Sequence, residues 1–133
     1  FVFVYSSEYI FYYSESEFHN LSDWMCAQFL SNGVKIDAAY FCPFHPEYGV
    51  GCYKVESFDR KPNPGMILRA EKDLGLDLAR SVLVGNNPSD IAAAKIAGVR
   101  HSIFLSETDE PAEFAPDIRL SSLREIIDYL FPN

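Results

Sequence analysis

Apolar residues along this chain occur either in short continuous runs or at intervals of three and four positions. Continuous runs predict strands at residues 1–5, 36–41, 81–84 and 101–105. The run at residues 81–84 is typical of a parallel strand covered on both faces, and residues 1–5 also lack alternation. Spaced apolar positions predict helices between these strands and after Ser122. This order, with a short edge strand at 117–120, predicts an α/β fold of three layers with a doubly wound parallel sheet.

The helix ends carry recognisable signals. Ser14 and Ser122 each stand three residues before a glutamate, which is the form of a capping box. Gly33, Gly75 and Gly98 are expected to end the first three helices. The second helix follows Pro64 and is expected to place Met66, Ile67, Ala70 and Leu74 on one face.

Two loops are candidate functional segments. Residues 42–59 form a long stretch rich in Pro, Gly and Tyr, and loops of that length in compact domains are usually functional or mobile. Residues 85–90 follow the buried strand directly and lead into a small-residue helix at 91–97. Since open α/β sheets bind ligands at the carboxyl ends of their strands, the second loop is the expected place for chemistry.

Composition limits the possible partners. The 133 residues contain 48% hydrophobic positions, which favours one packed domain spanning residues 1–133. A net charge of −8 disfavours nucleic acid and anionic membranes but leaves room for a phosphorylated small molecule held by a local basic pair. No apolar run is long enough to cross a bilayer and no signal peptide is seen. Three cysteines favour a reduced, cytoplasmic setting, although one disulfide plus a free thiol stays open.

Three segments in order carry a family resemblance. Residues 60–66 (RKPNPGM), 84–90 (VGNNPSD) and 93–99 resemble the third and fourth motifs of haloacid-dehalogenase-type (HAD) phosphatases. The most similar branch contains the D,D-heptose 1,7-bisphosphate and histidinol phosphatases, and the resemblance extends from about residue 14 to 105. It implies a HAD-like, Rossmann-like fold without a large cap domain. It also implies Mg²⁺-dependent hydrolysis of a phosphomonoester of a small, heptose bisphosphate-like sugar.

The resemblance assigns roles to residues near the two motifs. Lys61 is expected to pair with phosphate and the nucleophile, Arg60 to contact the substrate, and Asn87 to lie at a phosphate-binding position. Asn86 stands where the family has a metal-binding aspartate, and Asp90 where a second acidic residue follows, so both are candidate Mg²⁺ ligands. Because asparagine brings no negative charge, a turn that caps the next helix is the favoured interpretation for this chain taken alone.

The family's Asp-x-Asp nucleophile motif does not occur in this chain. Residues 1–7 align in two ways. In the favoured alignment they match the family's second strand, so that Ser6 or Ser7 supplies the phosphate-binding hydroxyl and the first strand is not in this chain. In the other they match the first strand, with Tyr5 and Ser7 at the aspartate positions. A second hypothesis is therefore a catalytically silent relative, or a fragment, that binds a phosphorylated ligand or a protein partner.

Zinc is a further candidate metal, because the heptose phosphatase branch carries a Cys/His set before the Arg-Lys-Pro motif. Here Phe44 stands at the histidine position and Ser57 at a cysteine position. The Cys42 position is kept and Asp59 stands at the second cysteine position, so that Cys42, His45, Cys52 and Asp59 form at most an improvised set of four ligands. Closed zinc sites normally use cysteine and histidine throughout, so we do not expect this incomplete set to hold zinc.

Overall fold

A computed structural model describes residues 2–6, 14–108 and 113–133 of the chain. The contacts divide the chain into two units, Phe1–Arg60 and Lys61–Asn133, which are described separately below. The predicted role of Ser7 and the predicted start of a strand at residue 1 lie outside the described residues. The expectation of one domain over residues 1–133 stays a prediction.

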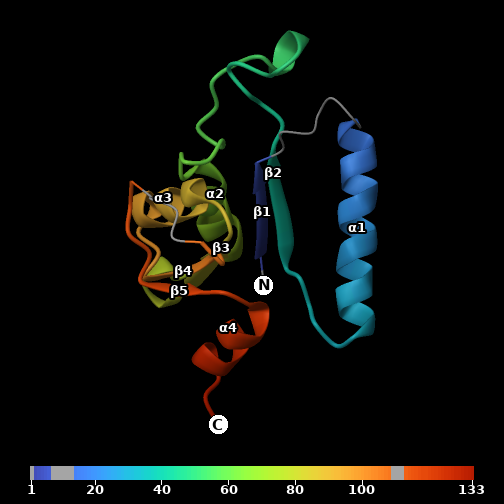
Figure 1. Ribbon diagram of the computed structural model, residues 1–133. Helices are drawn as coiled ribbons and strands as arrows, with labels where there is room; N and C mark the ends of the chain where they lie inside the picture. Colours follow the sequence, from blue (N-terminus) through green and yellow to red (C-terminus); the bar gives the residue numbers. More distant parts are fainter. Residues whose placement is uncertain (1, 7–13, 109–112) are drawn as a thin grey trace. The chain divides into compact units, whose positions relative to one another are not determined.

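The first unit contains two strands, a helix and a 3₁₀ turn: β1 (Val2–Ser6), α1 (Glu15–Ser31), β2 (Ala38–Cys42) and η1 (Gly51–Tyr53) (Figure 1). β1 and β2 pair in parallel, with Val2 opposite Ala38 and Ser6 opposite Cys42. Two parallel strands need a crossover connection, and α1 lies within it. Within the described residues β1 pairs with β2 and with no other strand.

α1 begins where the sequence predicts. Ser14 Oγ accepts the backbone N–H of Glu17 at 3.2 Å, and the Glu17 carboxylate accepts the backbone N–H of Ser14 at 2.7 Å. These bonds from Ser14 lower the pKa of Glu17. Phe18 is buried, with its ring centroid 4.3 Å from that of Phe41 on β2. Much of the helix's apolar surface is nevertheless exposed, so burial is narrower than the apolar spacing indicates.

The second unit contains three helices, a 3₁₀ turn and three strands. In order these are α2 (Gly65–Leu74), η2 (Leu78–Arg80), β3 (Val82–Gly85), α3 (Pro88–Ala97), β4 (His101–Leu105), β5 (Ile118–Leu120) and α4 (Leu123–Leu130). The strands form a parallel sheet in the order β3-β4-β5. Its core joins α2, η2 and α3 around Ile67, Leu78, Ala93, Ala94 and Val99, with Leu83 of β3 packed against them. One face of β3 is therefore covered by α2 and α3.

The expectation that this strand is buried on both faces is wrong. Val82 and Val84 are 45% and 43% exposed, whereas Leu83 between them packs into the core. Successive side chains of a strand point to opposite faces, so the face carrying the two valines lacks cover. The remaining helix of this unit, α4, packs against β5. Its Tyr129 ring stacks on the ring of His101 at the start of β4, with the ring centroids 5.7 Å apart.

Two smaller expectations also need correction. The third helix begins at Pro88 rather than at residue 91, because Asn87 caps it and Pro88 suits a first helical position. Leu74 is exposed although Met66, Ile67 and Ala70 on the same helix are buried, as expected. The predicted ends at Gly75 and Gly98 are confirmed, since both glycines adopt left-handed backbone angles at the helix C-caps.

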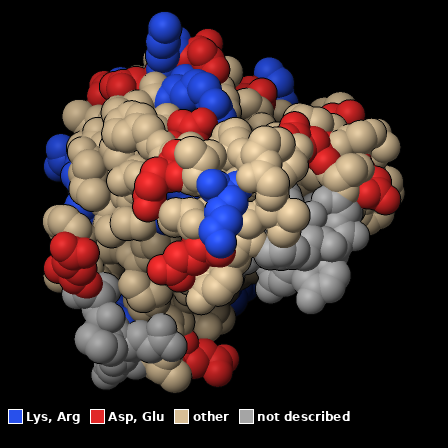
Figure 2. All heavy atoms as spheres, turned by 90° about the horizontal axis from the view of Figure 1, so that it is seen from above, with Lys and Arg blue, Asp and Glu red and all other residues tan. Residues whose placement is uncertain are grey.

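Figure 2 shows how charge is distributed over one face. Lys and Arg side chains lie among Asp and Glu side chains, and the coloured residues of this face contain no continuous basic area. Among the described residues, no helix combines the length and the apolar character that crossing a membrane requires.

Candidate active site

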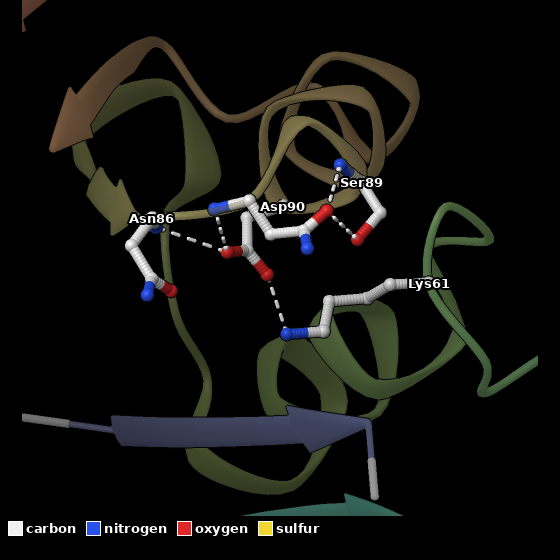
Figure 3. A network of polar contacts seen from close by, with 5 residues as sticks. Lys61, Asn86, Ser89 and Asp90 are labelled. Carbon is white, nitrogen blue, oxygen red and sulfur yellow. Dashed lines mark hydrogen bonds and ion pairs between the residues drawn. The ribbon is translucent and has the colours of Figure 1, made fainter. Parts of the chain in front are cut away.

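The carboxyl end of β3 and the start of α3 form a tight polar turn (Figure 3). Asn87 caps α3: its side-chain oxygen accepts the backbone N–H of Ser89 at 3.0 Å and the Ser89 hydroxyl at 2.9 Å. Asp90 completes a reciprocal capping box by accepting the backbone N–H of Asn87. The capping box therefore holds Asp90 in place through contacts within the turn itself.

Asp90 divides its two carboxylate oxygens between two tasks. Oδ2 accepts the backbone N–H groups of Asn86 at 3.1 Å and Asn87 at 3.0 Å. Oδ1 accepts the ammonium of Lys61 at 2.5 Å. The same side chain thus holds the turn after β3 and brings in a lysine from 29 positions earlier.

Gly85, the last residue of β3, makes this arrangement possible. A Cβ atom at position 85 would overlap the Cβ atom and the carboxylate of Asp90. Its backbone angles are ordinary, so the requirement for glycine comes from close approach and not from conformation. The turn and the buried acid occupy the space that a side chain would need.

The lysine and the aspartate are almost completely shielded from water. Their side chains are 12% and 10% exposed. A buried ion pair needs further hydrogen bonds to offset desolvation, and the two backbone N–H groups on Asp90 supply them. The result is an ammonium group held in one place, with its charge paired to Asp90, at the carboxyl end of a parallel strand, where open α/β sheets bind ligands.

Among the predicted site residues, the structure brings together Lys61, Asn86, Asn87 and Asp90 in the second unit. Arg60 closes the first unit, where its guanidinium makes a long contact of 3.5 Å with the carbonyl oxygen of Phe44. Ser6 ends β1 in that same unit. The functional roles assigned to all of these residues stay predictions.

The four residues considered for zinc all lie in the first unit. Cys42 is buried, with Sγ 3.8 Å from the carbonyl oxygen of Phe44, whereas Cys52 is exposed. His45 Nδ1 accepts two backbone N–H groups of its own loop. Among the residues that the structure describes, no group of three or more His, Cys, Asp or Glu side chains is placed to hold a metal ion.

The turn after β3 offers only some of the ligands that a magnesium ion needs. The Asn86 side chain is exposed and, in the described part of the chain, makes no hydrogen bond, so its amide oxygen is a possible donor. The Asp90 carboxylate already faces an ammonium and two N–H groups. Magnesium prefers several oxygen ligands in octahedral geometry and is usually held with carboxylates. The described residues therefore do not complete a magnesium site by themselves.

Sequence reasoning missed the bond between Lys61 and Asp90, although it selected both residues. Asn87 and Asp90 stand three positions apart, as the members of a capping box do, and this spacing was a readable signal for the position of Asp90. The need for Gly85 had no such signal, because it depends on how closely Asp90 approaches the strand.

Known proteins resemble this chain in sequence and in fold. Residues 58–126, just over half of the chain, match the family described as "HAD-hyrolase-like". A D-glycero-alpha-D-manno-heptose-1,7-bisphosphate 7-phosphatase of Burkholderia mallei is 55% identical over 98 residues, which are 74% of this chain and 52% of that protein. A D-glycero-beta-D-manno-heptose-1,7-bisphosphate 7-phosphatase of Vibrio cholerae is 41% identical over 121 residues, 89% of this chain and 65% of that protein.

A solved structure agrees with the fold. The D,D-heptose 1,7-bisphosphate phosphatase from B. bronchiseptica, in complex with magnesium and phosphate, matches 97% of this chain and 72% of its own with a TM-score of 0.74 at 21% identity. The chain belongs to the HAD-like hydrolase family, and its α/β fold is of the HAD, Rossmann-like type. It spans between about half and two thirds of the length of the curated relatives named above.

Proposed function

We propose that the protein to which these 133 residues belong hydrolyses a phosphomonoester of a small sugar, with heptose bisphosphate as the substrate class. The observation that supports this most directly is the buried Lys61–Asp90 pair at the carboxyl end of β3. A lysine held there by an acid keeps its charge in one place, and a preorganised charge stabilises an anionic transition state without moving first. The printed names of the relatives supply the substrate class.

In this proposal Lys61 binds the transferring phosphoryl group and Asp90 positions Lys61. Arg60 contacts a second charged or polar group of the substrate, and Ser6 or Ser7 donates a hydrogen bond to phosphate. Asn87 contributes mainly by starting α3. The cytoplasmic location expected from the odd number of cysteines belongs to the same proposal.

Magnesium is part of the proposal because the related enzyme from B. bronchiseptica was solved with magnesium and phosphate. When bound, such an ion neutralises charge on the phosphoryl oxygens. Asn86, whose side chain is exposed, would offer it an oxygen. Since Asp90 is held by Lys61, no step assigned here to this chain's residues passes through the metal.

A second candidate is a catalytically silent protein that binds the same ligand. It is favoured by one observation, namely that the chain contains no Asp-x-Asp motif to supply the attacking carboxylate. Silent binding needs only the fixed lysine and the residues around it, so Lys61 is expected to matter under both hypotheses.

One experiment separates the two candidates. Phosphate release from heptose 1,7-bisphosphate is measured with and without Mg²⁺, and binding of the same compound is measured by calorimetry on the same folded sample. We expect Mg²⁺-dependent release that falls about 100-fold or more in Lys61→Ala, since removing one preorganised charge commonly has that effect. Lys72→Ala, which removes an exposed lysine from the last turn of α2, is the matched control.

The outcomes are distinct. Binding that depends on Lys61 without any phosphate release would favour the silent relative. A folded sample that shows neither binding nor phosphate release would overturn both candidates.

A further inference from the structure

Loop 43–59, which joins β2 to the Arg60-Lys61 pair, is closed on itself by hydrogen bonds around His45. The backbone N–H of His45 donates to the carbonyl oxygen of Tyr53 at 3.0 Å, and the His45 carbonyl accepts the N–H of Gly49 at 3.0 Å. A Cβ atom at Gly49 would overlap the carbonyl oxygens of both His45 and Tyr53. The loop's backbone is therefore packed tightly at this point.

The imidazole of His45 adds two more bonds. Its Nδ1 atom accepts the backbone N–H of Glu47 at 3.1 Å and that of Tyr48 at 3.0 Å. The ring also packs on the Tyr48 ring, with centroids 4.6 Å apart. A ring nitrogen that accepts hydrogen bonds carries no proton, so the proton of the neutral imidazole lies on Nε2. His45 thus acts like an Asp or Asn that closes a turn through its side chain.

The loop contacts Arg60 through Phe44, the residue that precedes His45. The carbonyl oxygen of Phe44 accepts the Arg60 guanidinium at 3.5 Å, which is a long contact that depends on where that carbonyl is held. The Phe44 ring lies 6.0 Å from the ring of Tyr53. Tyr53 in turn donates its hydroxyl to Glu15 at the start of α1, at 2.8 Å, and this bond raises the pKa of Tyr53. The loop is consequently tied to α1 through Tyr53 and to Arg60 through the carbonyl group of Phe44.

We propose that His45 is a positioning residue: by accepting two backbone N–H groups through Nδ1 it fixes loop 43–59, and the fixed loop places Arg60 for the substrate. Arg60's contact with the substrate rests on the function proposed above, whereas the ordering of the loop does not. Among the residues described, hydrogen bonds and ring contacts carry out this ordering, and no complete set of metal-binding side chains is available for it.

The test compares two variants of the full chain. His45→Asn keeps a side-chain oxygen that accepts both N–H groups, because Asn forms the equivalent turn, whereas His45→Ala removes the acceptor. Amide hydrogen exchange at Glu47 and Tyr48 is measured in each. We expect protection close to wild type in His45→Asn and exchange about tenfold faster or more in His45→Ala, since both hydrogen bonds that hold these two amides are then lost. His19→Ala, on α1, is the control that leaves the loop intact.

The link to Arg60 is measured by kinetics or, for a silent protein, by affinity. For heptose 1,7-bisphosphate, His45→Ala is expected to raise KM or Kd about fivefold with kcat within about twofold, and His45→Asn to restore the wild-type value. In the double variant His45→Ala, Arg60→Ala, the fold-increase in KM or Kd should be much smaller than the product of the increases in the two single variants. The reason is that His45 is proposed to act on the substrate through Arg60.

Each contrary result overturns a stated part of the inference. Unchanged exchange at Glu47 and Tyr48 in His45→Ala overturns the role of His45 in the loop. Faster exchange with unchanged KM and Kd overturns the link to Arg60. A folded wild-type chain that neither binds nor hydrolyses the bisphosphate contradicts the proposed function and the Arg60 link with it, while the exchange rates still decide the role of His45.

Discussion

At the scale of single residues, the second unit depends on one carboxylate. Asp90 holds the turn after β3 with one oxygen and Lys61 with the other, so local backbone geometry and a long-range ion pair share a side chain. Removing one partner of a buried pair leaves an uncompensated charge, which is more costly than removing both. The pair is therefore expected to show strong energetic coupling.

A double-mutant cycle measures that coupling. Lys61→Met is expected to lower the free energy of unfolding by about 3 kcal/mol, because the Asp90 charge stays buried without its ammonium. Combined with Asp90→Asn, the loss should be smaller than the sum of the two single losses by about 1–3 kcal/mol. Urea unfolding followed by circular dichroism provides the numbers. Lys35→Met is the control, since Lys35 and its partner Asp37 are 78% and 40% exposed and exposed pairs contribute little to stability. Strict additivity would contradict the coupling.

Gly85 gives a second prediction at this scale. Gly85→Ala is expected to destabilise by about 2 kcal/mol, because the new methyl group overlaps the Asp90 side chain and either the strand or the acid must move. Thermal unfolding measures the effect.

Gly75→Asn is the comparison for Gly85→Ala. Gly75 has a left-handed backbone, which asparagine tolerates, and open space around it. This variant should lose only a few tenths of a kcal/mol. Equal stabilities of the two variants would refute the role given to the close approach.

At the scale of secondary-structure elements, a polar clamp joins α3 to β4 and to the segment before β5. Asp117 Oδ2 accepts the ammonium of Lys95 at 2.7 Å, the backbone N–H of Ser102 at 2.7 Å and the Ser102 hydroxyl at 2.8 Å. Lys95 first, and then the two bonds from Ser102, hold the pKa of Asp117 well below its ordinary value. The clamp therefore requires an ionised carboxylate.

This clamp predicts a contribution to acid sensitivity. A carboxyl group whose pKa is lowered on folding stabilises the folded state above its ordinary pKa of about 4, and that stabilisation is lost as the pH falls further. Asp117→Asn should be less stable than wild type at pH 6, and its stability should fall less steeply between about pH 4 and 2. Asp128→Asn, which alters an exposed pair with Arg124, is expected to leave the slope unchanged. Parallel pH profiles for Asp117→Asn and wild type would contradict the assignment.

Local signals explain which elements were predictable. The caps at Ser14 and Ser122 and the glycines at 75 and 98 act within one turn of a helix, and the structure places helix ends at or next to all of them. At Ser122 the box is incomplete, because the Glu125 carboxylate accepts the backbone N–H of Ser121 instead of that of Ser122. The start of α3 was missed because Asn87-Pro88 suits a turn and a helix start equally well in sequence. The exposure of Val82 and Val84 depends on which elements cover β3, and no local pattern contains that information.

The residues of the site were predictable from local motifs, but their contacts were not. The residue types and their order selected Lys61 and Asp90 separately, since each lies in a recognisable motif. Their contact was not predictable, because it depends on how α2, β3 and α3 pack. The contacts of His45 and Tyr53 were not predictable for a related reason: their partners are backbone groups and a glutamate 38 positions away, and the sequence selected His45 only as a member of an incomplete zinc set.

At the scale of the whole molecule, each described sheet ends in a strand with one partner. β3 pairs with β4, and in the described part of the chain no strand pairs with its other edge. An edge strand with exposed valines is a template for pairing with another chain, and natural proteins usually protect such edges with charge.

Self-association through β3 is therefore expected for this chain at high concentration. Val84→Lys should lower the apparent mass measured by light scattering at about 100 µM, because a charge on the strand opposes stacking and pairing. Val50→Lys places the same charge at an exposed loop position and is expected to have no such effect. Equal masses for wild type and Val84→Lys would exclude this strand as the contact.

The divided role of Asp90 also limits how position 90 can vary. The start of α3 alone would accept a longer acid or an amide, since either can reach back to a backbone N–H. Opposite Lys61, an amide that keeps its oxygen on the turn presents its NH₂ group to an ammonium, and glutamate carries an extra methylene toward the glycine-lined strand. In a library of all twenty residues, each requirement alone would accept several of them, whereas together they leave aspartate.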